Sequence, residues 1–107
     1  MVQDIALDPE RNNYYYQLDE GVFDKDGNVI TDSPRILDIY SYGDTLFLGE
    51  DMGIIHRYDM KTGTMIREIT VPDQVNKMLY SPEQNTLFVA CEKNGIYCVN
   101  LDRKSVV

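Results

Sequence analysis

The sequence predicts an all-β protein made of about three four-stranded antiparallel units that follow one another along the chain. The chain is rich in Tyr, Val and Ile, with eight Tyr among its 107 residues, and such stretches favour pleated strands. Turn residues recur at roughly 8 to 12-residue intervals, which is typical of all-β proteins. No apolar stripe with helical spacing runs long enough to predict a helix.

Internal similarity is the strongest signal in the sequence. Residues 2–16 align with residues 75–89 without a gap, and residues 36–48 repeat the theme with a shorter turn. In the alignment of the first copy with the last, Val2 matches Val75, Pro9-Glu10 matches Pro82-Glu83 and Asn12 matches Asn85. In the middle copy, residues 45–48 match residues 86–89 almost completely. The repeat divides a single region, 1–107, into units of approximately 2–33, 34–73 and 74–107.

The middle unit shows the expected order of strands most clearly. Strands are predicted at residues 36–40, 46–48, 54–58 and 65–71, with Tyr42-Gly43-Asp44 and residues 59–63 supplying turns. In the first unit the third and fourth strands, within residues 21–33, look truncated. The last unit is expected to lose its fourth strand near Val107.

Residues 53–66 resemble the third-strand signature of WD-repeat proteins. That signature has a Gly, an apolar alternation, Trp-Asp and a Thr-Gly turn, and here Tyr58-Asp59 stands in the Trp-Asp place. Residues 95–101 repeat the strand with Val99-Asn100 there. The chain is therefore similar to a WD-repeat-like β-propeller with degenerate blades. It has no Trp and no Gly-His dipeptide, so the family's hydrogen-bonded His–Asp–Ser/Thr–Trp network cannot form, and a YVTN-type or quinoprotein-like propeller fits the pattern equally.

The resemblance implies a partial propeller. A closed propeller has roughly four to eight blades, whereas this chain holds about three four-stranded antiparallel blades, and open arrays need covered ends. Two sources of the remaining blades stay open: a longer chain, or self-association, for instance of two copies.

Charge and composition exclude several classes of partner. Ten Lys and Arg face eighteen Asp and Glu, for a formal charge of −8, so nucleic acid and anionic membranes would be repelled. No apolar run approaches the roughly 20 residues of a membrane span. We expect a cytoplasmic protein, because two cysteines are too few for a disulfide scaffold.

One acidic segment invites a calcium interpretation. Residues 24–28 read Asp-Lys-Asp-Gly-Asn, as at the start of an EF-hand loop. The match then fails, because Val29 stands where the loop needs Gly and Arg35 where it needs Glu. We predict a hairpin turn at Asp26-Gly27 and no metal site.

The remaining reactive residues suggest no catalysis and no bound cofactor. If Cys91 lies opposite Ile96 in the predicted hairpin, Cys98 is diagonal to it and poorly placed for a disulfide. Both are therefore predicted to be buried free thiols. His56 has no Ser or Cys nucleophile motif beside it. The Tyr14-Tyr15-Tyr16 run could form a stacking platform, but its position in the repeat favours the core.

The function predicted from these observations is a non-catalytic protein–protein interaction scaffold. Loops at one end of the blades would form an acidic rim suited to a basic protein partner. The residues predicted to form this rim are Asp19, Glu20, Glu50, Asp51, Met52, Asp73, Glu92, Lys93 and Asn94. The alternatives are a part of a quinoprotein-like propeller enzyme and a ligand-binding sensor or lectin-like propeller.

Overall fold

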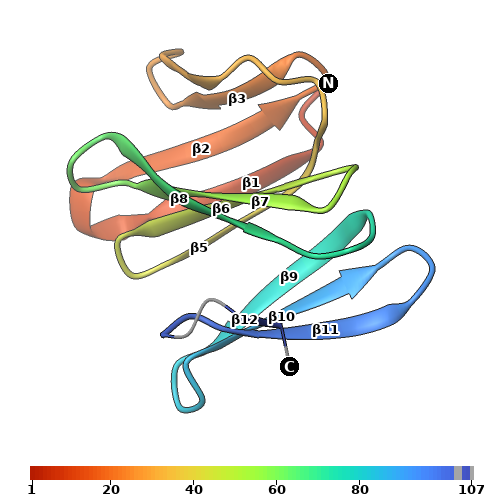
Figure 1. Cartoon of the computed structure of the whole chain (residues 1–107). Coiled ribbons are helices and arrows are strands. Elements are labelled where there is room, and N and C mark those ends of the chain that lie inside the picture. Colours follow the sequence, from red (N-terminus) through yellow and green to blue (C-terminus); the bar gives the residue numbers. More distant parts are fainter. Residues whose placement is uncertain (103–104, 107) are drawn as a thin grey trace.

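Three antiparallel sheets of four strands each follow one another along the chain, as the computed structural model shows for residues 1–102 and 105–106. Each sheet takes its strands in sequence order, and the second sheet lies between the first and the third (Figure 1). The first sheet contains β1 (Asp4–Asp8), β2 (Asn13–Leu18), β3 (Gly21–Asp24) and β4 (Val29–Thr31), the second β5 (Ile36–Tyr42), β6 (Thr45–Glu50), β7 (Ile54–Asp59) and β8 (Thr64–Thr70), and the third β9 (Val75–Ser81), β10 (Thr86–Cys91), β11 (Gly95–Asn100) and β12 (Ser105–Val106). A short 3₁₀ turn, η1 (Pro9–Arg11), joins β1 to β2.

The turn after the first strand shows that the internal repeat is structural. Asn12 and Asn85, which the sequence alignment pairs, both adopt the left-handed conformation, with φ of 51° and 47°. In both turns the Asn N–H donates to a proline carbonyl, to Pro9 at 3.2 Å and to Pro82 at 3.3 Å. Asn tolerates this conformation better than most residues do. The gapless alignment of residues 2–16 with 75–89 is therefore correct at this turn.

The strands expected in the middle unit are all present, with ends that differ by at most two residues. The short third and fourth strands of the first unit are confirmed, since β3 has four residues and β4 has three. Asp26-Gly27 lies in the hairpin between them, where Gly27 has a φ of 85°. The expected loss of the last unit's fourth strand is wrong, because β12 pairs with β11 through Val99–Val106 and Asn100–Ser105; Val107 itself lies outside the described residues.

Two apolar layers hold the three sheets together. Between the first and second sheets lie Ala6, Tyr15, Val22, Ile36, Ile39, Leu46, Leu48 and Met60. Between the second and third sheets lie Phe47, Ile55, Ile69, Val71, Val75, Met78, Leu87, Val89 and Val99. The second sheet contributes to both layers, because alternate residues of a strand point to opposite faces. In β6 the consecutive apolar residues Leu46, Phe47 and Leu48 accordingly serve both layers.

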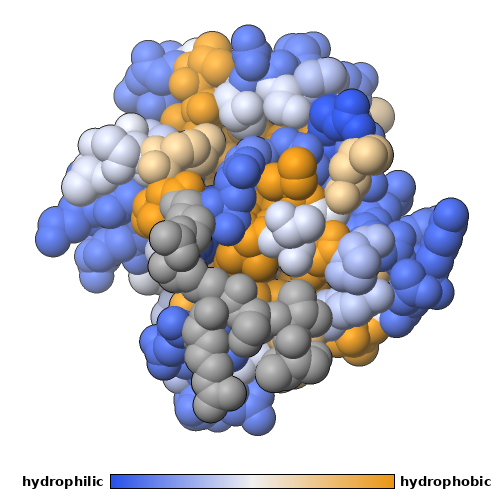
Figure 2. All heavy atoms as spheres, viewed as in Figure 1, coloured by the Kyte–Doolittle hydropathy of each residue, from blue (hydrophilic) through white to orange (hydrophobic). Residues whose placement is uncertain are grey.

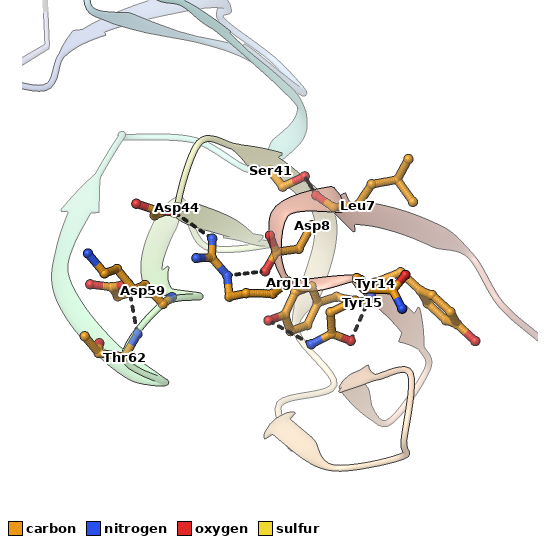
Figure 3. A network of polar contacts seen from close by, with 12 residues as sticks. Leu7, Asp8, Arg11, Tyr14, Tyr15, Ser41, Asp44, Asp59 and Thr62 are labelled. Carbon is orange, nitrogen blue, oxygen red and sulfur yellow. Dashed lines mark hydrogen bonds and ion pairs between the residues drawn. The ribbon is translucent and has the colours of Figure 1, made fainter.

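Polar contacts link the first and second sheets at one end (Figure 3). Arg11 donates from Nε to Asp8 Oδ2 and from Nη2 to Asp44 Oδ1, both at 2.6 Å, and so joins η1 to the β5–β6 turn. Beside it, the Ser41 hydroxyl donates to the Leu7 carbonyl at 2.7 Å. These bonds lie where β1 and β5 run next to each other.

Gly49 allows the second and third sheets to approach closely. A Cβ atom built on Gly49 would lie 2.5 Å from Val75 Cγ1, which is far inside van der Waals contact. Glycine at this position therefore allows β6 of the second sheet to lie close to β9 of the third.

Shortening a side chain of the first apolar layer should destabilise the fold strongly. Leu48 has no exposed surface, so we expect Leu48→Ala to lower the free energy of unfolding by about 2–5 kcal/mol. Leu37 lies on the neighbouring strand and is 40% exposed, and Leu37→Ala should cost about 1 kcal/mol or less. Chemical denaturation of both variants measures the difference, and equal losses would contradict this assignment of the core.

The left-handed conformation of Asn12 leads to a second prediction about stability. Ala at position 12 would be strained at positive φ, so Asn12→Ala should lower the free energy of unfolding by about 1 kcal/mol. Asn12→Gly should be nearly neutral, because glycine adopts this conformation without strain. Thermal unfolding separates the two variants, and a glycine variant as unstable as the alanine variant would show that the Asn side chain matters instead.

Candidate interaction surface

The outer face of the first sheet is apolar and uncovered. We use this name for the face that carries Ile5, Leu7, Tyr14, Tyr16, Phe23 and Val29, which the strand register places side by side. Ile5, Leu7 and Val29 are each more than half exposed. Orange apolar residues accordingly reach the surface over the first sheet, at the top of Figure 2. Contiguous apolar patches of this kind mark interaction surfaces.

The outer face of the third sheet has the same character. It carries Lys77, Leu79, Phe88, Ala90, Ile96 and Cys98, again as cross-strand neighbours. Leu79 is 56% exposed and Ile96 68% exposed. Lys77 is the single charged side chain among these six residues. Among the residues that the structure describes, both ends of the stack of sheets are therefore apolar surfaces without a covering layer.

The tyrosine run divides between the core and this outer surface. Tyr15 is 3% exposed and meets Tyr58 of the second sheet edge to face, with ring centroids 6.1 Å apart. Tyr14 and Tyr16 point the other way, and Tyr16 stacks on Phe23 at 5.7 Å. The expectation of core packing holds for Tyr15, whereas Tyr14 is 40% exposed because nothing in the described residues covers the outer face.

Five of the predicted rim residues are brought together at one end of the second and third sheets. Asp51 and Met52 of the β6–β7 turn, Asp73 of the β8–β9 link, and Glu92 and Lys93 of the β10–β11 turn line an open hollow of about 280 Å³. Neighbouring links and turns are tied by backbone bonds, from Asp51 N to Arg35 O and from Glu92 N to Gln74 O. Three carboxylates and one lysine give the hollow an acidic balance.

Asp73 has a structural role in this rim. Its Oδ2 accepts the N–H groups of Lys93 at 2.7 Å and Asn94 at 3.0 Å, and its Oδ1 accepts the N–H of Gln74. These bonds, led by that from Lys93, lower the pKa of Asp73, because they favour the charged carboxylate. The link into the third sheet is thereby fixed to the β10–β11 turn.

Other predicted rim residues lie elsewhere or are occupied. Asp19 and Glu20 are exposed in the β2–β3 turn, outside the hollow, and Asp19 accepts a hydrogen bond from Gln3. Glu50, which was also predicted as a rim residue, is only 8% exposed. Its Oε2 lies 2.6 Å from His56 Nε2, while His56 Nδ1 lies 3.2 Å from Glu68. Glu50 belongs to the end of β6, where the strand register turns its side chain inward.

A row of charged residues on the inner strands was not predicted. Asp4 of β1, Asp38 of β5 and Lys77 of β9 hold the same position in their sheets, opposite Gln17, Gly49 and Ala90. The carboxylate of Asp4 accepts the N–H of Ile39 at 3.2 Å, and that of Asp38 accepts the N–H of Met78 at 2.8 Å. Each carboxylate thus bonds the first strand of the next sheet. The gapless alignment pairs Asp4 with Lys77, but it carries no signal for contacts between sheets.

Asp38 has the most perturbed carboxyl group of this row. Burial, followed by a hydrogen bond with the Asp4 carboxyl, raises the pKa of Asp38 to about 7. Lys77 Nζ, 3.7 Å from Asp38 Oδ1, acts in the opposite direction. Two carboxyl groups in contact favour retention of a proton. The row borders an open hollow of about 530 Å³ along β1 and β5, which Asp4 and Lys77 line.

The two thiols are free, as predicted, but only half-buried. Cys91 lies opposite Gly95, and Ile96 pairs with Ala90, so the hairpin register differs by one residue from a pairing of Cys91 with Ile96. Cys91 packs against the layer between the second and third sheets, whereas Cys98 pairs with Phe88 on the outer face. Burial raises the pKa of Cys91. Among the described residues no group of three His, Cys, Asp or Glu side chains could hold a metal ion.

These features define an all-β protein of three stacked antiparallel sheets with an acidic rim and two uncovered apolar faces. No family model matches the chain. Over 76 residues, 71% of its length, it is 26% identical to the human Fanconi anemia core complex-associated protein 100. The chain spans only 8% of that protein's length. Within residues 1–102 and 105–106, no helix is long and apolar enough to cross a membrane.

The inner-strand row predicts a stability that falls as the pH rises. The pKa of Asp38 is about 7 in the folded chain and 3.8 ordinarily, so the folded state binds the proton more tightly. This contribution is complete below the ordinary value and is lost as the pH rises through about 7. We expect Asp38→Asn, which cannot ionise, to reduce the loss of unfolding free energy between about pH 5 and about pH 8 by at most about 3 kcal/mol.

Denaturation of both proteins across this pH range checks the prediction. Asp102→Asn is a suitable control, since Asp102 is exposed. A wild-type pH dependence that the Asp38 variant reproduces would contradict the assignment.

Proposed function

We propose that this chain is a non-catalytic protein–protein interaction scaffold built from WD-repeat-like propeller blades. Support comes from three consecutive four-stranded antiparallel meanders that stack face to face in chain order. Their innermost strands, β1, β5 and β9, lie next to one another, as the inner strands of blades around an axis do. On this reading each sheet is one blade, and the chain is part of a ring.

The acidic rim is the site we assign to a protein partner. The observation that carries this proposal is the convergence of the β6–β7 turn, the β8–β9 link and the β10–β11 turn on one open hollow. Met52, which is 66% exposed, offers an adaptable apolar contact there. Asp51 and Glu92 surround it with negative charge. A basic segment with an apolar residue at its centre would match both features.

The human relative supports a role in assembly. Its name describes a protein associated with a core complex, and we extend that kind of role, binding to other proteins, to this chain. The ion pair between Arg35 and Asp51 does not close the rim, because both side chains are well exposed and such pairs exchange readily with other partners.

An oligo-arginine peptide provides a direct test of the rim. We expect amide NMR shifts on titration to concentrate at residues 51–52, 73–74 and 92–94, and to weaken as salt screens the contact. The double variant Asp51→Asn, Glu92→Gln keeps side-chain shape and removes two charges. Its affinity for the peptide should fall roughly 5- to 30-fold, since each of the two exposed ion pairs contributes about 0.5–1 kcal/mol.

A matched control separates this site from general acidity. Glu10→Gln, Glu83→Gln removes the same charge from two exposed residues in the β1–β2 and β9–β10 turns, away from the rim. This variant should retain most of the affinity. Shifts spread evenly over the surface, or an equal loss in the two double variants, would overturn the rim as the partner site.

A further inference from the structure

Two sheet–sheet contacts occur within the chain, and the two uncovered faces correspond to the two opposite sides of such a contact. The face of the first sheet that carries Ala6 packs on the face of the second sheet that carries Ile39. One step along, the opposite face of the second sheet packs on the face of the third sheet that carries Met78. Each contact thus joins one kind of face, which we call leading, to another kind, which we call receiving.

The strand register shows which kind of face each end presents. Ile5 holds the position in its sheet that Ile39 and Met78 hold in theirs, so the outer face of the first sheet is a receiving face. Leu79 holds the position of Ala6, so the outer face of the third sheet is a leading face. The third sheet of one molecule can therefore dock on the first sheet of another in the geometry used within the chain.

Charge along the inner strands favours this docking. Equivalent positions lie side by side across each stacked pair: Asp4 hydrogen-bonds Asp38, and Asp38 lies near Lys77. One further stacking step brings Lys77 of one molecule beside Asp4 of the next. The single cation of the row then lies between two carboxylates, Asp38 of its own chain and Asp4 of its neighbour. The N–H of Ile5, which would face Lys77, already donates to Asp4 Oδ1 at 2.9 Å, so no donor is left unpaired.

We propose that two copies of this chain dock through these faces, third sheet on first sheet, and close a ring. This goes beyond the scaffold role, because it names the occupant of the two apolar faces. A head-to-tail contact gives a closed ring when its rotation permits and an open fibre when it does not. Two copies of three sheets give six, which lies within the roughly four to eight blades of closed propellers. Closure also covers both apolar faces of each copy at once.

Light scattering after size exclusion, over a series of protein concentrations, tests the proposal. We expect the molar mass of two chains, falling to that of one chain only on strong dilution. Leu7→Glu on the receiving face and Leu79→Glu on the leading face should each give a single chain, because either substitution places a charge in the apolar contact. Both leucines are more than half exposed, and circular dichroism and thermal unfolding verify that each variant is folded.

Lys77 and Lys61 provide a matched pair of variants for the contribution of charge. Lys77→Glu places three acidic residues together and should shift the dissociation midpoint to at least 10-fold higher concentration. Lys61→Glu makes the same charge change in the exposed β7–β8 turn and should leave the midpoint unchanged. A wild-type protein that stays monomeric at all concentrations would overturn the proposal and leave the faces to sheets of another chain.

Two other outcomes would also overturn it. A dimer that survives Leu79→Glu but not Leu7→Glu would be a symmetric pair of first sheets. A mass that grows without limit as concentration rises would show that the contact does not close. The rim test with the oligo-arginine peptide is independent of all these outcomes, since the rim hollow includes none of the substituted residues.

Discussion

Each of the three sheets is apolar on both of its faces, and this requires a neighbouring layer on each side. The second sheet meets the requirement within the chain, with the layer around Leu46 and Leu48 on one face and the layer around Phe47 and Ile55 on the other. Apolar burial at about 25 cal/mol per Å² supplies the stability of such a stack. Among the described residues, the first and third sheets are covered on one face only, so each end of the stack leaves an apolar face without a neighbouring layer.

Polar groups set how the sheets are aligned on one another. The carboxylates of Asp4 and Asp38 bind the backbone N–H groups of Ile39 and Met78, one residue type serving the same purpose at two successive contacts. Apolar packing alone does not specify this alignment, because it has little directional preference. The raised pKa of Asp38 is a consequence first of its burial between the sheets and then of its hydrogen bond with the Asp4 carboxyl. The same row ends in Lys77, which gives the two ends of the chain opposite charge on the inner strands.

The apolar faces and the acidic rim suit different partners. An apolar sheet face can pack on another sheet, whereas the rim, where Met52 lies with Asp51 and Glu92, is the site that we propose for a basic segment of a partner. The two surfaces lie on different parts of the stack, so occupation of one leaves the other accessible. A ring closed through the sheet faces would therefore still present its loops, which is the arrangement that a scaffold needs.

The sequence by itself determined the all-β class, the three repeated units and the Asn12 and Asn85 turns, because these depend on alternation and turn chemistry within short segments. It also located the turns between strands, since the turns are fixed once the strands are assigned. Only the tertiary structure showed that Glu50 is held by His56, that Tyr14 and Tyr15 have opposite environments, and that Asp4, Asp38 and Lys77 form one row. Those outcomes depend on which sheet covers which face and on a bulge in β5 and another in β9. Contacts between residues about 35 to 40 positions apart leave no mark in local sequence patterns.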